Sequence, residues 1–210
     1  MQALGYRLDR THQALIVWSR EPEVNTDDLE VMVDRILLAA HGARALPIKA
    51  KASVVWLWLS DPVGIEDLSA IAEENFEIAA GQVLPGLAGF RDSHRTALIT
   101  QQMMLKTKRE ENVVSYDQIK LAHLMLQQSD FSHVAAATLG KLFKAPEGIR
   151  ESLRVYLAEG ANAAQAAKKR GLHRNTLNRH LERANDLLPE PLHAGNRLQI
   201  GAVLDALSWG

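Results

Sequence analysis

Basic and amide side chains are concentrated between Asn162 and Arg183. This segment carries six basic residues and one acidic residue, a local charge of +5 in a chain whose formal net charge is −1. The basic residues are Lys168, Lys169, Arg170, Arg174, Arg179 and Arg183, and the acid is Glu182. Arginine and asparagine side chains can bond the edges of guanine and adenine, and lysine attracts phosphate in a salt-dependent manner. These residue types therefore favour a site for double-stranded DNA.

The pattern around the basic segment predicts helices that would position these side chains. One helix begins after Asn162, with Gln165 completing a capping box, and ends at Gly171. A further helix begins near His173 or Arg174, and its inner face carries four apolar residues: Leu177, Leu181, Ala184 and Leu188. Two helices joined by a tight glycine turn are typical of a helix-turn-helix, whose second helix enters the major groove. We expect eight DNA-binding residues: Lys168, Lys169, His173, Arg174, Asn175, Thr176, Asn178 and Arg179.

The composition limits the other classes of function. The 210 residues include no cysteine, which excludes disulfides, thiolate zinc sites, iron–sulfur clusters and thiol nucleophiles. The longest apolar run, Val54–Leu59, is too short to cross a membrane, and the N-terminus lacks the pattern of a signal peptide, so we expect a cytoplasmic protein. With 24 basic and 25 acidic residues, any site for a polyanion must be a local patch.

The first two-thirds of the chain has the pattern of an α+β domain, a sheet with packed helices. Apolar runs predict strands at residues 14–18, 48–50, 54–59, 76–83 and 113–116, and helical spacing predicts intervening helices, the longest at 90–106. The order β-α-β-β-α-β favours an antiparallel or mixed sheet with helices on one face, and Trp56 and Trp58 share one face of their strand. We expect this domain at residues 1–128, a helical connector at 129–148 and an all-α helix-turn-helix domain at 149–210.

No catalytic or metal-binding constellation is evident in the sequence. Gly81, Gly86 and Gly89 lack the spacing of a phosphate-binding loop and are better explained as shaping a strand-to-helix turn. The eight histidines show no metal-ligand spacing, and the neighbours Ser93 and His94 cannot face each other on a helix. We therefore expect no enzyme activity, no cofactor and no metal.

Two stretches resemble a known family of bacterial regulators. Residues 151–183, with the string His173-Arg174-Asn175-Thr176-Leu177, resemble the C-terminal helix-turn-helix of PucR-type (CdaR-like) transcriptional regulators. Residues 86–97 resemble the end of the degenerate cyclase-like (GGDEF-like) domain that precedes it in that family. The resemblance implies a sequence-specific regulator of transcription.

The chain departs from the family pattern at three places. Asn178-Arg179-His180 stands where Arg-Tyr-Arg is usual, so no base preference can be transferred. Arg170 occupies a usually apolar position, and its stem would have to lie along the core. Family members usually carry a further N-terminal sensory domain, so the chain is either a short version or a fragment.

Several functional alternatives remain open at this point. Cyclic dinucleotide synthesis would need metal-binding carboxylates on a hairpin, whereas Ile48–Ser53 carries two lysines and no acid, which favours a scaffold, dimerisation or relay role. A protein-interaction module could use the same basic face for an acidic partner, and a nucleotide-binding sensor would bind a nucleotide with magnesium. We expect a homodimer or higher homo-oligomer, because palindromic half-sites demand two recognition helices. A small-molecule effector of unknown identity is a further expected partner.

Overall fold

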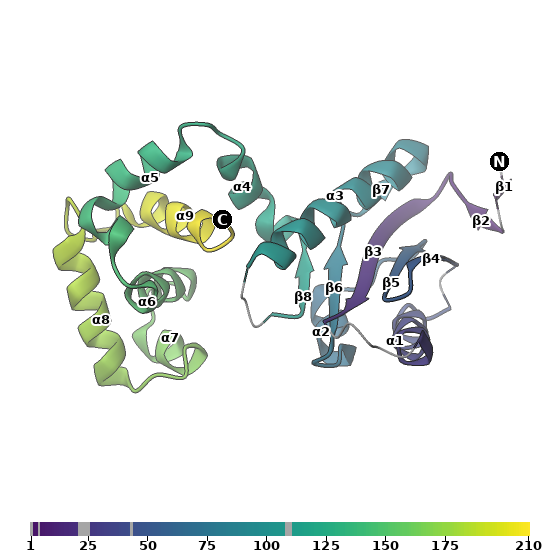
Figure 1. Ribbon diagram of the computed structural model, residues 1–210, viewed down its shortest axis with the longest axis horizontal. Helices are drawn as coiled ribbons and strands as arrows, with labels where there is room; N and C mark the ends of the chain where they lie inside the picture. The colour runs from purple at the N-terminus through teal and green to yellow at the C-terminus, as the bar shows by residue number, and fades with distance from the viewer. Residues whose placement is uncertain (1, 4, 21–25, 43, 108–110) are drawn as a thin grey trace. The chain divides into compact units, whose positions relative to one another are not determined.

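The computed structural model describes residues 2–3, 5–20, 26–42, 44–107 and 111–210 (Figure 1). The chain divides into two compact units, residues 1–120 and 121–210, and the division falls within α4 (Tyr116–Leu126). Each unit is described separately below. The finer division expected at residues 128 and 148 stays a prediction.

Unit 1 contains a mixed sheet with the strand order β4-β5-β3-β6-β8. Its strands are β3 (Thr11–Ser19), β4 (Ala45–Lys51), β5 (Val54–Leu59), β6 (Phe76–Ala80) and β8 (Val113–Ser115). All neighbours are antiparallel except β6 and β8, which are parallel. Short β7 (Leu84–Pro85) pairs with the start of β3, and β1 (Gln2–Ala3) pairs with β2 (Tyr6–Arg7). The apolar run at residues 14–18 was predicted as a strand and is the buried middle of β3, which the structure places at the centre of the sheet.

Helices cover both faces of this sheet (Figure 1). Leu15 and Val17 of β3 belong to a core shared with α1 (Thr26–Ala39) and α2 (Ile65–Ile71). On the opposite face, α3 (Gly86–Lys106) packs against Trp58, whose indole N–H donates to the Phe90 carbonyl at 3.1 Å. The expectation of helices on one face was therefore wrong, because β3 is buried on both sides and needs apolar partners on both.

Three element boundaries differ from the sequence prediction for identifiable reasons. Strand β4 begins at Ala45 and continues through Pro47, which an edge strand tolerates because its outer N–H groups need no partner. Strand β6 ends before Gly81, where a Cβ atom would lie 1.9 Å from the Ser93 carbonyl oxygen of α3. Helix α3 begins at Gly86, whose φ of +72° suits glycine, rather than at residue 90. These glycines shape the strand-to-helix connection, as predicted.

Unit 2 is entirely helical over its described length. Its elements after α4 are α5 (Phe131–Leu139), the 3₁₀ helix η1 (Gly140–Lys144), α6 (Glu147–Ala158), α7 (Ala163–Lys169), α8 (Arg174–Leu187) and α9 (Arg197–Leu207). A mixed sheet with helices followed by an all-helical region confirms the predicted fold class. Within the described residues, no helix has both the length and the apolar character needed to span a bilayer.

Candidate nucleic-acid interface

Helices α6, α7 and α8 form a small three-helix core. Its buried members are Val155 from α6, Ala166 and Ala167 from α7, and Leu177 from α8. The small alanine side chains allow α7 to lie close to its neighbours. Leu172, in the turn between α7 and α8, packs against this cluster. The core therefore holds α7, the turn and the start of α8 together as one piece.

Side-chain caps define where both helices of this piece begin. The Asn162 side-chain oxygen accepts hydrogen bonds from the backbone N–H groups of Ala164 and Gln165, at 3.0 and 3.2 Å. The Asn162 N–H donates to the Glu159 carbonyl, so the reciprocal bond from the Gln165 side chain expected for a capping box is replaced. At the start of α8, His173 Nδ1 accepts from the Asn175 N–H at 3.3 Å. His173 therefore caps the helix, a role that its sequence position did not reveal.

The eight predicted DNA-binding residues lie at the end of α7, in the turn and in the first two turns of α8. Six of them are exposed: Lys168, Lys169, His173, Arg174, Asn175 and Arg179. Thr176 and Asn178 are partly exposed. Leu177, one residue after Thr176, is fully buried, so the core-facing and outward-facing positions of α8 are clearly separated.

The basic residues of α7 differ in their surroundings. Lys169 Nζ lies 2.9 Å from the Glu159 carboxylate, which stands between α6 and α7. Among the described residues, Lys168 has no carboxylate within ion-pair distance. The Arg170 side chain is partly buried, and its Nε atom is buried with no hydrogen-bond partner among the described residues. Of the two exposed lysines of this short helix, Lys169 is therefore ion-paired, and Lys168 has no such partner among the described residues.

An ion-pair network connects α6 to α9. Arg154 bonds both carboxylate oxygens of Glu151, at 2.8 and 2.7 Å, and the Asp205 carboxylate of α9 at 3.2 Å. The Arg154 side chain is 13% exposed, so this bidentate pair is shielded from solvent. The partners lie up to 51 positions apart, and the sequence analysis did not identify them.

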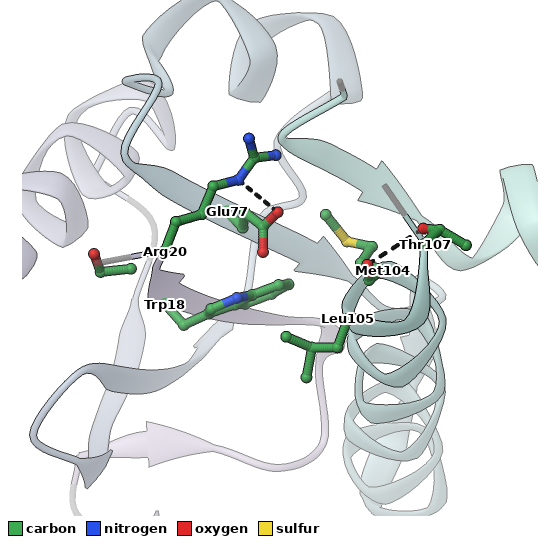
Figure 2. A pocket seen from close by; sticks show the side chains of 7 residues that line it. Trp18, Arg20, Glu77, Met104, Leu105 and Thr107 are labelled. Carbon is green, nitrogen blue, oxygen red and sulfur yellow. Dashed lines mark hydrogen bonds and ion pairs between the residues drawn. The ribbon is translucent and has the colours of Figure 1, made fainter. Parts of the chain in front are cut away.

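Unit 1 has an open hollow of about 470 Å³ at the end of β3 (Figure 2). Figure 2 shows Arg20 and Glu77 on one side of the Trp18 indole and Leu105 of α3 on the other. Arg20 Nε donates to Glu77 at 2.7 Å, so this guanidinium already has a carboxylate partner. The hollow is therefore lined by the Trp18 indole and by the ion pair between Arg20 and Glu77.

The β4–β5 hairpin lies beside the end of β3. The Ser19 N–H donates to the Ser53 carbonyl in the hairpin turn at 3.3 Å. Lys49 and Lys51 are exposed on this hairpin. In the part of the chain that the structure describes, no three His, Cys, Asp or Glu side chains are grouped as metal ligands.

Aromatic rings surround one histidine of unit 1. The ring centroid of His94 lies 4.5 Å from that of Trp56 and 4.8 Å from that of Trp58. Its Nε2 atom is buried without a hydrogen-bond partner among the described residues. Burial lowers the pKa of His94, because an imidazolium there would lose its hydration.

Comparison with known proteins agrees with this division into two units. Residues 149–206 match the PucR C-terminal helix-turn-helix domain, and residues 1–103 match the GGDEF-like domain. The regulator of polyketide synthase expression from Bifidobacterium adolescentis is a similar solved structure, with 13% sequence identity and a TM-score of 0.44. That similarity covers 98% of this chain and 87% of the other. No match was found among curated proteins.

The helical fold of unit 2 and the match of residues 149–206 to a helix-turn-helix domain define a helix-turn-helix DNA-binding protein. More specifically, the chain belongs to the PucR-type transcriptional regulators, and its helix-turn-helix follows a GGDEF-like domain. The family resemblance noted in the sequence is thereby confirmed.

Proposed function

We propose that this regulator recognises its operator by placing the N-terminal half of α8 in the major groove. The observation that carries the proposal is the exposure of Arg174 and Asn175 at the start of a helix whose Leu177 is fully buried beneath them. A recognition helix needs this arrangement, because its inner side must be held while its leading end remains free.

The side chains divide into base-reading and phosphate-binding groups in this proposal. Arg174 suits the two acceptors of guanine, and Asn175 and Asn178 suit adenine. Thr176 offers its hydroxyl to phosphate, and Arg179 adds positive charge one turn further along. Lys168 and Lys169, late in α7, would lie against the DNA backbone.

His173 has one ring nitrogen occupied by its helix cap, which leaves the other for a DNA contact. Its Nδ1 atom accepts the Asn175 N–H, so the neutral ring carries its proton on Nε2. We therefore assign His173 a donor contact to phosphate or base through Nε2, in addition to its cap.

The substitution Arg174→Ala tests the base-reading role. We expect it to weaken binding to the preferred duplex by about 1–3 kcal/mol, and binding to random duplex much less. Lys141→Ala is the control, because it removes an exposed positive charge from η1, where the neighbouring Gly140 lies near Leu187 and Pro189 at the C-terminal end of α8. Selection from a randomised duplex pool, followed by anisotropy titration, measures both affinities. Equal enrichment by the wild type and Arg174→Ala would contradict the role.

The GGDEF-like domain serves regulation rather than catalysis in this proposal. Supporting it, the exposed Lys49 and Lys51 stand on the hairpin where cyclic dinucleotide synthesis would need carboxylates. Calorimetric titration with GTP and magnesium tests this role. Magnesium-dependent GTP binding, or dinucleotide product, would favour the nucleotide-enzyme or nucleotide-sensor alternative instead.

Two further expectations accompany the proposal. A regulator that binds chromosomal DNA acts in the bacterial cytoplasm. Salt-sensitive duplex binding with a sequence preference separates this proposal from the alternative of a protein-interaction module whose basic face binds an acidic partner. The small-molecule effector stays a prediction. The hollow beside Trp18 is one place to test for it, by the change in tryptophan fluorescence when a ligand is added.

A further inference from the structure

One side chain of α8 is bonded to the helix beneath it. His180 Nδ1 lies 2.9 Å from the Ser152 hydroxyl oxygen of α6, 28 positions away in the sequence. Ser152 is fully buried. His180 is also one of the three residues that depart from the usual family pattern after Leu177.

The direction of this hydrogen bond follows from the bonds of Ser152. The Ser152 hydroxyl donates to the Gly148 carbonyl at 2.7 Å, and a hydroxyl has only one proton. His180 must therefore donate its Nδ1 proton to the Ser152 oxygen. A continuous chain of two hydrogen bonds thus runs from α8 to the first turn of α6.

His180 lies on the inward side of α8. It follows the buried Leu177 by three residues and precedes the buried Ala184 by four, which places all three on one side of the helix. The outward side carries Asn175 and Arg179, which are exposed and four residues apart. Rotating α8 about its axis would therefore change the His180 bond and the direction of the outward side chains together.

Apolar contacts alone do not fix this rotation strongly. The buried members of the α6–α7–α8 core are valine, alanine and leucine, with the partly buried Tyr156 packed against them, and the hydrophobic effect has no preferred direction. A hydrogen bond does, since it weakens steeply when the angle at the proton falls. The His180–Ser152 bond is thus a directional element within a small apolar core.

We propose that His180 is a positioning residue that fixes the rotation of α8 through Ser152 and so contributes to operator specificity. This inference rests on the proposed function of α8. His180 itself need not touch a base, and its effect is on the discrimination between the operator and random DNA rather than on attraction to phosphate.

Two amide substitutions with different reach test the proposal. In His180→Asn the amide N–H can take the place of Nδ1–H, whereas the longer side chain of His180→Gln places its amide near the Nε2 position. We expect His180→Asn to keep the wild-type ratio of operator to random-duplex affinity. We expect His180→Gln and Ser152→Ala to lower that ratio about tenfold, the size of one base contact, with random-duplex affinity changed about twofold or less.

The double variant separates this role from general destabilisation. If the bond carries the effect, His180→Gln with Ser152→Ala loses no more specificity than either single change. Thermal unfolding of each variant identifies those that remain folded at the assay temperature. Because Ser152→Ala removes only one oxygen atom, it serves as the test should His180→Gln not fold.

The outcomes are distinguishable. A folded Ser152→Ala protein with the wild-type affinity ratio would overturn the inference and leave the proposed function standing. A wild-type protein that prefers no duplex sequence would overturn the proposed function, and this inference with it.

Discussion

The adjacent lysines of α7 should contribute unequally to DNA binding. Lys169 is held 2.9 Å from Glu159, whereas Lys168 has no such carboxylate among the described residues. We expect Lys168→Met to weaken binding to every duplex and to reduce the slope of log affinity against log salt by about 0.9, the value for one lost phosphate contact. Lys169→Met should change the slope less, because Glu159 already neutralises that charge. Anisotropy titrations at several salt concentrations measure both slopes.

Glu159→Gln provides the complementary change. It removes the carboxylate while keeping the shape of the side chain, so Lys169 becomes available to phosphate. We expect tighter binding to operator and random duplex alike, with a steeper salt dependence. A larger loss from Lys169→Met than from Lys168→Met would contradict this explanation.

His94 should make the protein sensitive to mild acid. Burial between Trp56 and Trp58 lowers its folded-state pKa below the ordinary 6.5, so the unfolded chain binds a proton at higher pH than the folded chain does. Between those two pKa values the free energy of unfolding therefore falls as the pH falls. His94→Gln cannot be protonated and should show a smaller decline below pH 6.5. Urea unfolding of both proteins at a series of pH values measures the difference, and parallel declines would disprove the role of His94.

Residue types alone revealed the exposed polar group on α8 but not the bonds that support it. The basic and amide residues at positions 168–179 could be found because charge and helix-start signals are local. The Ser152–His180 and Lys169–Glu159 pairs could not, because each depends on how two helices pack. The capping role of His173 was missed because its neighbours made it look like one more polar contact residue.

At the scale of elements, the close approach of β6 and α3 should tolerate no added methyl group. A Cβ at Gly81 would lie 1.9 Å from the Ser93 carbonyl oxygen, and both positions are held by backbone structure. We expect Gly81→Ala to lower the free energy of unfolding by about 3 kcal/mol, as overpacking does. Urea unfolding monitored by tryptophan fluorescence measures the loss, because three of the four tryptophans lie in unit 1.

Gly201→Ala is the control that separates steric overlap at Gly81 from the general effect of replacing glycine by alanine. Gly201 lies inside α9, where an added Cβ would meet Leu157 at an ordinary 3.7 Å. Alanine should therefore stabilise unit 2 by up to about 1 kcal/mol through its higher helix propensity. A Gly81→Ala protein as stable as the wild type would show that α3 can move away from β6, contrary to this explanation.

The order of elements could be predicted, whereas their layering could not. Apolar periodicity located the five strands of the path β4-β5-β3-β6-β8 and the shared face of Trp56 and Trp58, but not the two-residue strands β1, β2 and β7. The pattern did not show that α3 covers the second face, since a run buried on both sides gives no period. Pro47 was likewise interpreted as preceding its strand, because edge position depends on the assembled sheet.

For the whole molecule, the net charge of −1 does not reveal the strongly basic segment between Asn162 and Arg183. The +5 segment of unit 2 is balanced by acids elsewhere, so composition alone excluded only a globally basic protein. The combination of an αβ unit and a helical unit followed from local patterns, and the family matches agree with it. Oligomeric state depends on surfaces that patterns of this kind do not identify.

The number of chains on the operator is therefore the remaining prediction. One α8 contacts only a few base pairs, so we expect two chains to bind half-sites with their centres about 34–36 Å apart, or a multiple of that spacing. Sedimentation velocity with labelled operator duplex should give two chains per duplex. Inserting five base pairs between the half-sites turns one of them by about half a helical turn. Affinity should then fall to that of a single half-site. One bound chain per duplex, with affinity unchanged when one half-site is scrambled, would show that the regulator acts as a monomer on DNA.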